Sequence, residues 1–209
     1  MLQDSLFPSH ETKDISLFGF GELHIVKRFL NGFDADHYFD ILKAELDWQQ
    51  PTTTVFGKTQ KIPRLQAWYG DEGKAMRYSG QSFMPTAWHP SLIALKAEIE
   101  TEARHKFNSV LANMYRNGND SVGWHADDEK ELGDKPIIAS LSLGESRRFC
   151  LKPKNDRLPN GEVNKIRVDL ASGDLLVMKG DTQRFWQHAV LKAPGVIAPR
   201  INLTFRKII

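Results

Sequence analysis

The chain contains a single cysteine, Cys150, among its 209 residues. A lone cysteine cannot form an internal disulfide, so a disulfide-stabilised scaffold is excluded. No stretch approaches the roughly 18 consecutive apolar residues that would span a bilayer. The first residues, MLQDSLFPSH, lack the basic segment and apolar run of a signal peptide. We therefore expect an intracellular protein without a membrane partner, in the cytoplasm of a bacterium or the nucleus of a eukaryote.

A strong net charge is also missing, since 28 Lys and Arg residues against 26 Asp and Glu residues leave +2. The basic residues are nevertheless clustered. Positions 147–167 hold seven basic and two acidic residues, and a weaker basic cluster occupies positions 58–77. Such clusters favour a phosphate backbone, whose affinity for Lys and Arg comes largely from counterion release. A solvated surface with dispersed counter-charges would explain the same composition.

No internal repeat, low-complexity tract or linker divides the sequence, so we expect one monomeric domain over residues 1–209. Helical spacing of apolar residues predicts one helix from Asp34 or Asp36 to before Pro51, and another that begins near Pro90. The apolar positions of this second helix are Leu92, Leu95, Ile99 and Phe107.

After residue 108 the pattern changes to short β-like runs, from VLANMY to RINLTFRKII. Helices in about 1–107 followed by strands in about 108–209 favour helices that buttress an antiparallel sandwich or barrel, not alternating βαβ units. The strand lengths and turn spacing are typical of a jelly roll. The predicted fold class is therefore α+β, with a jelly-roll core.

The segment GWHADDE places His125 and Asp127 two residues apart, so that both face the same side of an extended chain. His188, in the later segment RFWQHAV, is the best candidate for a third ligand. Two histidines and a carboxylate leave open positions on a metal, as in non-haem Fe(II) oxygenases. A surface pair, a hydrogen-bonded core histidine or a zinc hydrolase would fit the same residue types.

The segment RINLTFR alternates polar and apolar residues, so Arg200 and Arg206 share one face of a strand. Guanidinium groups bind carboxylates bidentately, and two of them on this face indicate a site for a short dicarboxylate. An exposed face with salt bridges is the alternative. The other residues that we expect around the same molecule are Asn113, Tyr115, Asn202 and Thr204.

Together, NMY (113–115), HAD (125–127), the lone downstream His188 and RINLTFR (200–206) resemble the AlkB family of Fe(II)- and 2-oxoglutarate-dependent dioxygenases. Three earlier stretches resemble its duplex-DNA repair branch, so the resemblance covers most residues from about Val55 onward. These stretches are VFGKTQKIPR (55–64), WYGD (68–71) and YSG (78–80).

This resemblance implies a double-stranded β-helix whose N-terminal region forms a nucleotide-recognition lid. It implies Fe(II) at His125, Asp127 and His188, and 2-oxoglutarate at the six polar residues named above. Enzymes of the family use O2 to hydroxylate an N-methyl group of bases such as 1-methyladenine or 3-methylcytosine, and release formaldehyde, succinate and CO2. The implied partner is alkylated DNA, duplex or single-stranded, with RNA as a further substrate.

By the same resemblance, Tyr78 and the His125 ring would sandwich a flipped cationic base. Asp128, assisted by Glu129, would accept from its exocyclic amine. A solvated acidic turn is the alternative for these two carboxylates. Met76 departs from the pattern, since duplex-acting relatives carry an aromatic residue there.

Phe56 lies at a predicted hairpin tip, where an apolar ring would fill the gap that a flipped base leaves in the stack. Lys58 and Arg64 would then hold nearby phosphates. The alternative is that Phe56 belongs to the core. A ring that fills such a gap argues against two other functions on this fold, an RNA demethylase and a protein hydroxylase. A single strand has no stacked duplex in which a flipped base would leave a gap. The three intact ligand candidates argue against a non-catalytic DNA-binding module.

Overall fold

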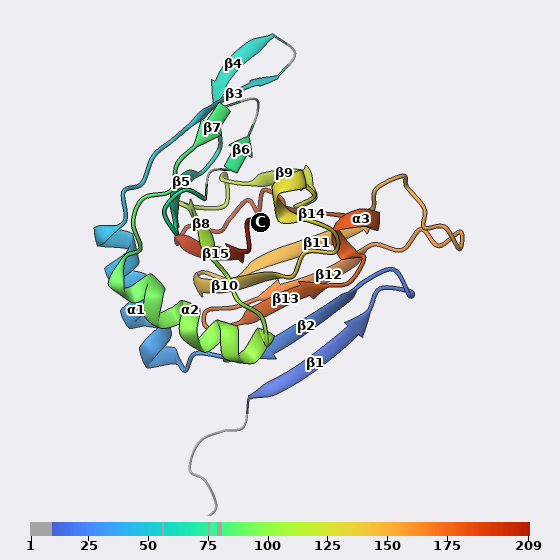
Figure 1. Ribbon diagram of the computed structural model, residues 1–209, viewed down its shortest axis with the longest axis horizontal. Coiled ribbons are helices and arrows are strands. Elements are labelled where there is room, and N and C mark those ends of the chain that lie inside the picture. The colour runs from blue at the N-terminus through green and yellow to red at the C-terminus, as the bar shows by residue number, and fades with distance from the viewer. Residues whose placement is uncertain (1–9, 56, 75, 79–80) are drawn as a thin grey trace, which may run out of the picture.

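The computed structural model describes residues 10–55, 57–74, 76–78 and 81–209, and two antiparallel sheets form its centre (Figure 1). The larger sheet has seven strands in the order β1-β2-β13-β10-β15-β8-β5, and the smaller has four in the order β12-β11-β14-β9. The strands of the larger sheet are, in that order, Glu11–Ser16, Glu22–Lys27, Leu175–Lys179, Ile138–Gly144, Arg200–Arg206, Ser109–Tyr115 and Leu65–Gly70. Those of the smaller sheet are Ile166–Leu170, Arg147–Pro153, Trp186–Val190 and Val122–His125. The predicted jelly-roll core is confirmed.

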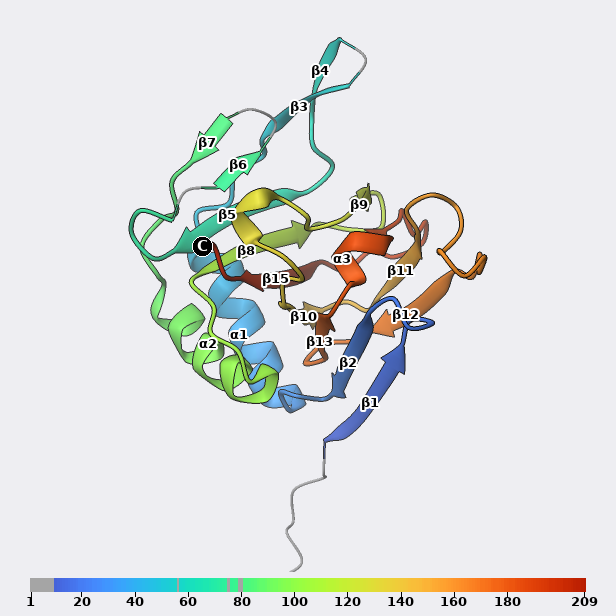
Figure 2. The ribbon, with the colours of Figure 1, turned by 45° about the vertical axis from the view of Figure 1, so that its right-hand side comes forward.

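Two short hairpins and a few helices complete the architecture. The hairpins project together beyond one end of the sheets (Figures 1 and 2), where the sequence predicts a lid. They consist of β3 (Thr52–Val55) with β4 (Lys58–Lys61), and of β6 (Met76–Tyr78) with β7 (Gln81–Phe83). The helical segments are α1 (Gly32–Glu45), α2 (Pro90–Ala103), α3 (Thr182–Phe185) and the 3-10 turn η1 (Lys130–Leu132). Within the described ranges, no helix is both long and apolar enough to cross a bilayer.

Helix α1 begins before the residues predicted to cap it. Asn31 is the N-cap, and its side-chain oxygen accepts from the Asp34 amide at 3.0 Å. This bond satisfies one of the free amides of the first turn, so the helix starts at Gly32 and not at Asp34 or Asp36. It packs on β10 and on α2, which places both helices on the outer face of the larger sheet.

Helix α2 begins at Pro90, as predicted, because proline suits the first helical turn. Its residues Leu92, Leu95 and Ile99 are fully buried in the core between helix and sheet. Phe107 is buried as well, but it lies beyond the end of the helix at Ala103.

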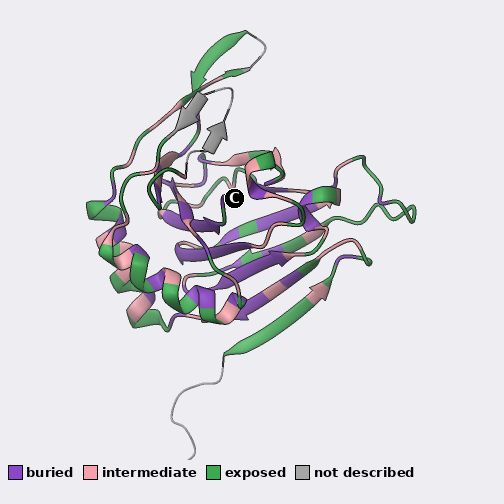
Figure 3. Cartoon of the chain, in the orientation of Figure 1, coloured by how far each residue is buried: buried purple, intermediate pink, exposed green. Residues whose placement is uncertain are grey.

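The first 107 residues contribute strands to the sheet as well as helices, which the predicted division at residue 108 did not include. Strands β1 and β2 extend one edge of the larger sheet, and β5 forms the other. Strand β1 was missed because its residues are nearly all exposed, so it has no apolar alternation to detect (Figure 3). The N-terminal half therefore contributes strands β1, β2 and β5 to the larger sheet.

His24 on β2 ties the β1–β2 hairpin to α2. Its Nδ1 lies 2.6 Å from Asp14 Oδ1 on β1, and its Nε2 lies 3.0 Å from Glu102 Oε1 on α2. Burial lowers the pKa of His24, as does the nearby Lys179, but the hydrogen bonds with Glu102 and Asp14 outweigh both, so the pKa lies above 6.5. When it is protonated, the ring bridges two carboxylates from different elements.

We expect this bridge to stabilise the fold in acid more than in base. Because the pKa is higher in the folded chain, the stabilisation is complete below the unfolded value of 6.5 and disappears as the pH rises through the folded value. Urea unfolding of the wild type and His24→Gln should differ most below pH 6.5 and converge at high pH. An equal difference at every pH would contradict the assignment.

Candidate active site

A cavity of about 600 Å³ lies between the two sheets, beside the hairpins. Its floor is the inner face of β15, where the period of two brings Arg200, Asn202, Thr204 and Arg206 to the same side. Ile201, Leu203 and Phe205 face the opposite way, into the core under the helices. The alternation read from the sequence therefore separates core from cavity.

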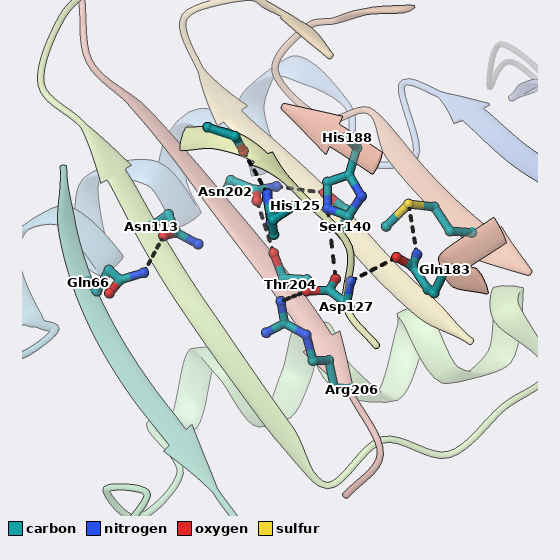
Figure 4. A network of polar contacts seen from close by, with 12 residues as sticks. Gln66, Asn113, His125, Asp127, Ser140, Gln183, His188, Asn202, Thr204 and Arg206 are labelled. Atoms are coloured by element: carbon teal, nitrogen blue, oxygen red, sulfur yellow. Dashed lines mark hydrogen bonds and ion pairs between the residues drawn. The ribbon is translucent and has the colours of Figure 1, made fainter. Parts of the chain in front are cut away.

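His125, Asp127 and His188 meet at one end of this cavity (Figure 4). Strands β9 and β14 pair with His125 directly opposite His188, and their ring centroids are 4.3 Å apart. Asp127 follows β9 by two residues. One ligand atom from each of the three residues lies within 4.8 Å of the others. Segments more than 60 residues apart thus form one cluster of candidate metal ligands.

The protonation states of this cluster suit a divalent metal. Burial would raise the pKa of Asp127, but the Arg206 guanidinium, His188 and His125 hold it at about 2. Burial, with help from His125, lowers the pKa of His188 to about 3. The His125 Nδ1 donates to the Gly123 carbonyl at 2.8 Å, which leaves Nε2 as its free nitrogen. At neutral pH, Asp127 is therefore charged and His188 neutral, the forms that bind metals.

Only one of the two carboxylate oxygens of Asp127 accepts a hydrogen bond from the described residues. Its Oδ1 accepts from Arg206 Nη2 at 2.7 Å, whereas Oδ2 is buried and has no hydrogen-bond partner among the described residues. An unpaired buried carboxylate oxygen is unfavourable unless something binds it. It lies 3.9 Å from His188 Nε2. Two imidazole nitrogens and a free carboxylate oxygen fit Fe(II) and leave positions open.

Arg200 lies at the far end of β15, away from Asp127. It is 1% exposed, its Nη2 donates to Ser142 Oγ at 2.9 Å, and its guanidinium carbon lies 5.4 Å from the centre of the Tyr115 ring. Burial lowers its pKa to about 10, so it stays charged at neutral pH. Its Nε and Nη1 have no partner in the described part of the chain. A buried cation with two free donors fits a carboxylate.

The remaining polar residues predicted around the dicarboxylate all line the cavity. Asn202 Nδ2 donates to Ser140 Oγ at 2.7 Å, and Thr204 Oγ1 donates to Asn202 Oδ1 at 3.0 Å. Asn113 Oδ1 accepts from Gln66 Nε2 at 2.9 Å (Figure 4). Arg206 differs from the prediction in one respect, because it pairs with Asp127 while its Nε and Nη1 stay free of partners within the described ranges.

Arg64 was predicted to hold a phosphate near Phe56, and the structure places its side chain in the wall of the cavity. This residue is 8% exposed, and its Nε donates to Asn113 Oδ1 at 2.8 Å inside the cavity. In this position the side chain supports the cavity wall, and its contact with a phosphate stays a prediction. Lys58, by contrast, is exposed on β4.

Asp128 and Glu129 differ in their position relative to the cavity. Asp128 turns outward, where Lys154 Nζ lies 2.6 Å from its Oδ2. It does not line the cavity, and its contact with a base stays a prediction. Glu129 does line the cavity, and its Oε2 is buried without a partner among the residues described. Burial, with the charge of Asp127, raises the pKa of Glu129.

Two predicted contacts with the base cannot be placed. Phe56 lies outside the described residues. Tyr78 and Met76 belong to β6, but their side chains lie outside the description as well. Their roles therefore stay predictions from the sequence. The β3–β4 hairpin does stand beside the cavity, since Thr52, Thr53 and Thr54 of β3 line it.

Several polar residues of the site were not predicted. Gln66, Ser140 and Ser142 supply hydrogen bonds to Asn113, Asn202 and Arg200. The serines alternate with leucines in the segment ASLSLG, and this pattern would have pointed to a polar face of a strand. Gln183 accepts a hydrogen bond from the Asp127 backbone amide. The sequence gives no comparable signal for this residue.

Comparisons with known proteins agree with this site. Residues 22–206 match the family described as "2OG-Fe(II) oxygenase superfamily". The chain is 42% identical over 194 residues to "Alpha-ketoglutarate-dependent dioxygenase alkB homolog 3" of Bos taurus, which covers 91% of this chain and 67% of that protein. It is 39% identical over 181 residues to "DNA oxidative demethylase ALKBH2" of Homo sapiens, covering 84% and 69%.

A solved structure supports the fold alone. It is titled "The structure of OsALKBH1", and it matches with a TM-score of 0.62 at 19% identity, covering 94% of this chain and all of that one. The candidate ligands, the buried arginines of β15 and the similarity to these relatives lead to one conclusion: the chain belongs to the AlkB family within the 2OG-Fe(II) oxygenase superfamily, and it is an enzyme.

Proposed function

We propose that this protein is an Fe(II)- and 2-oxoglutarate-dependent demethylase that repairs N-alkylated bases in DNA. One observation carries the proposal. Asp127 Oδ2, which has no hydrogen-bond partner among the described residues, lies beside two imidazoles at one end of a cavity, and the Arg200 donors that likewise lack a partner there lie at the other. A zinc hydrolase would need the three ligands but would leave the buried arginine without a role.

When iron and 2-oxoglutarate are bound, they supply oxidation by O2, which hydroxylates an N-methyl group so that it leaves as formaldehyde, with succinate and CO2 as coproducts. The protein supplies placement and charge. Arg200 would bind the distal carboxylate of 2-oxoglutarate, and Arg206 holds the Asp127 carboxylate in a fixed orientation. The Gly123 carbonyl orients the His125 ring through Nδ1.

The cavity also suits a flipped, methylated base. Methylation on the pairing edge makes adenine or cytosine cationic and weakens its pairing, which lowers the free energy needed to extrude it. Glu129 presents a carboxylate oxygen to this cavity, where it can accept from the exocyclic amine. The name of the human relative, which specifies DNA, supports DNA as the substrate.

Turnover of a defined oligonucleotide tests the proposal. The protein with Fe(II), 2-oxoglutarate and O2 should release formaldehyde and succinate from DNA that contains 1-methyladenine or 3-methylcytosine, and none from unmethylated DNA. An RNA oligonucleotide with the same lesion distinguishes an RNA demethylase. Succinate formation without nucleic-acid demethylation would favour a protein hydroxylase. If the protein binds iron but neither forms succinate nor demethylates nucleic acid, the proposal that it is an oxygenase is rejected.

Lys58 on the exposed β3–β4 hairpin is expected to contact a phosphate of the DNA. If so, Lys58→Gln should weaken binding at low salt and reduce the slope of log K against log salt by about 0.9. The matched control is Lys13→Gln, because Lys13 is exposed on β1. This strand is the edge of the larger sheet opposite β5. An unchanged slope for Lys58→Gln would remove this hairpin from the DNA interface.

A further inference from the structure

Gln183 holds the chain segment that carries Asp127 (Figure 4). Its Oε1 accepts the Asp127 backbone N–H at 2.9 Å, and its Nε2 donates to Met178 Sδ at 3.3 Å. Both Gln183 and Asp127 are 2% exposed. Asp127 lies in irregular chain between β9 and η1, so no neighbouring strand satisfies its amide. The glutamine side chain does so instead.

The carboxylate is therefore fixed from two sides. Arg206 on β15 binds its Oδ1, and Gln183 on α3 binds its backbone amide. With both contacts in place, the Asp127 side chain has little freedom to rotate or shift, and Oδ2 stays directed toward His188. Losing the amide contact would leave a buried N–H unsatisfied, which is unfavourable enough to displace the segment.

Helix α3 is itself anchored to the N-terminal hairpin. The Thr182 hydroxyl donates to the Lys179 carbonyl at 2.5 Å and accepts from the Glu22 amide at 3.1 Å. Gly21 approaches so closely that a Cβ there would overlap the Thr182 hydroxyl. The single helical turn that presents Gln183 is thus held by a segment about 160 residues away.

We propose that Gln183 is a positioning residue for the iron centre, which sets metal affinity through the Asp127 amide without contacting the metal. This inference rests on the proposed function, since it requires Asp127 to be a ligand. Contacts behind a ligand commonly change metal affinity 10- to 100-fold when they are lost. We expect an effect of that size here.

The experiment measures Mn(II) binding, with Mn(II) as a redox-stable substitute for Fe(II). Gln183→Met keeps the length and volume of the side chain but removes the acceptor, so the Kd for Mn(II) should rise about 10- to 100-fold. Gln183→Glu keeps an oxygen at the accepting position and should bind Mn(II) at least as tightly as Gln183→Asn, whose shorter side chain cannot reach the amide. Gln187→Met, on the adjoining β14, is the matched control and should bind like the wild type.

The outcomes separate the inference from the proposed function. A wild type that binds no Mn(II) would reject the proposed iron site itself. A wild type that binds, together with Gln183→Met at unchanged affinity, would overturn only the role of Gln183. Thermal unfolding of the metal-free variants identifies a purely structural effect, in which stability falls but affinity does not. If Gln183→Met fails to fold, Gln183→Asn against Gln183→Glu gives the same comparison.

Discussion

Asp127→Ala is expected to abolish stoichiometric metal binding and demethylation, and to lower the free energy of unfolding by about 3–5 kcal/mol. The loss of function follows from removing the only carboxylate among the three candidate ligands. The loss of stability follows because Arg206, which is 4% exposed, would keep a buried charge without its partner. Urea unfolding in the presence of a chelator measures the second effect without contribution from metal.

A double variant separates the two effects. In Asp127→Ala with Arg206→Met no charge is left uncompensated, so its stability should exceed that of Asp127→Ala alone, while metal binding stays absent. If Asp127→Ala unfolds at the urea concentration of the wild type, the ion pair with Arg206 contributes nothing and its proposed orienting role is wrong.

Arg200→Met is expected to weaken 2-oxoglutarate binding strongly. Removing one partner of a buried, hydrogen-bonded charge pair costs about 2–5 kcal/mol, which corresponds to a Kd higher by roughly 30-fold to several thousand-fold. The ligand-free variant should be no less stable than the wild type, because in the described part of the chain Arg200 has no carboxylate partner to lose. Titration of 2-oxoglutarate in the presence of Mn(II) measures the affinity.

A ligand without the distal carboxylate provides the control. Wild type and Arg200→Met should bind 2-oxobutyrate with similar affinity, since Arg200 then has nothing to hold. Arg148→Met controls for loss of positive charge, because Arg148 is exposed and paired with Asp169 at 2.8 Å. Equal losses for both ligands in Arg200→Met would mean that the cavity has collapsed and that the assignment of Arg200 fails.

Much of this site could be predicted because it follows the period of two along strands. The alternation in RINLTFR identified the face of β15 that lines the cavity, and the spacing of His125 and Asp127 identified two candidate ligands. The rule does not extend to Asp128, which lies in irregular chain after β9, where its exposed side chain pairs with Lys154.

Other features depend on partners far away in the sequence. Arg64 has the charge of a phosphate-binding residue, but its partner is Asn113, and only the fold brings the two together. Strand β1 has no apolar pattern, since its pairing with β2 consists of backbone hydrogen bonds at an exposed edge. Gln183 contacts Asp127 across 56 residues. Local periodicity carries no information on such contacts.

The central place of β15 has a consequence for biosynthesis. This strand lies between β10 and β8, and it pairs with β8 from Arg200 to Arg206 and with β10 from Arg200 to Phe205. A nascent chain that has not yet released residue 206 from the ribosome therefore exposes two unpaired apolar strand edges, which are prone to aggregate. Arg206 reaches Asp127 only when β15 has paired, so the Asp127 carboxylate gains its fixed orientation at that step.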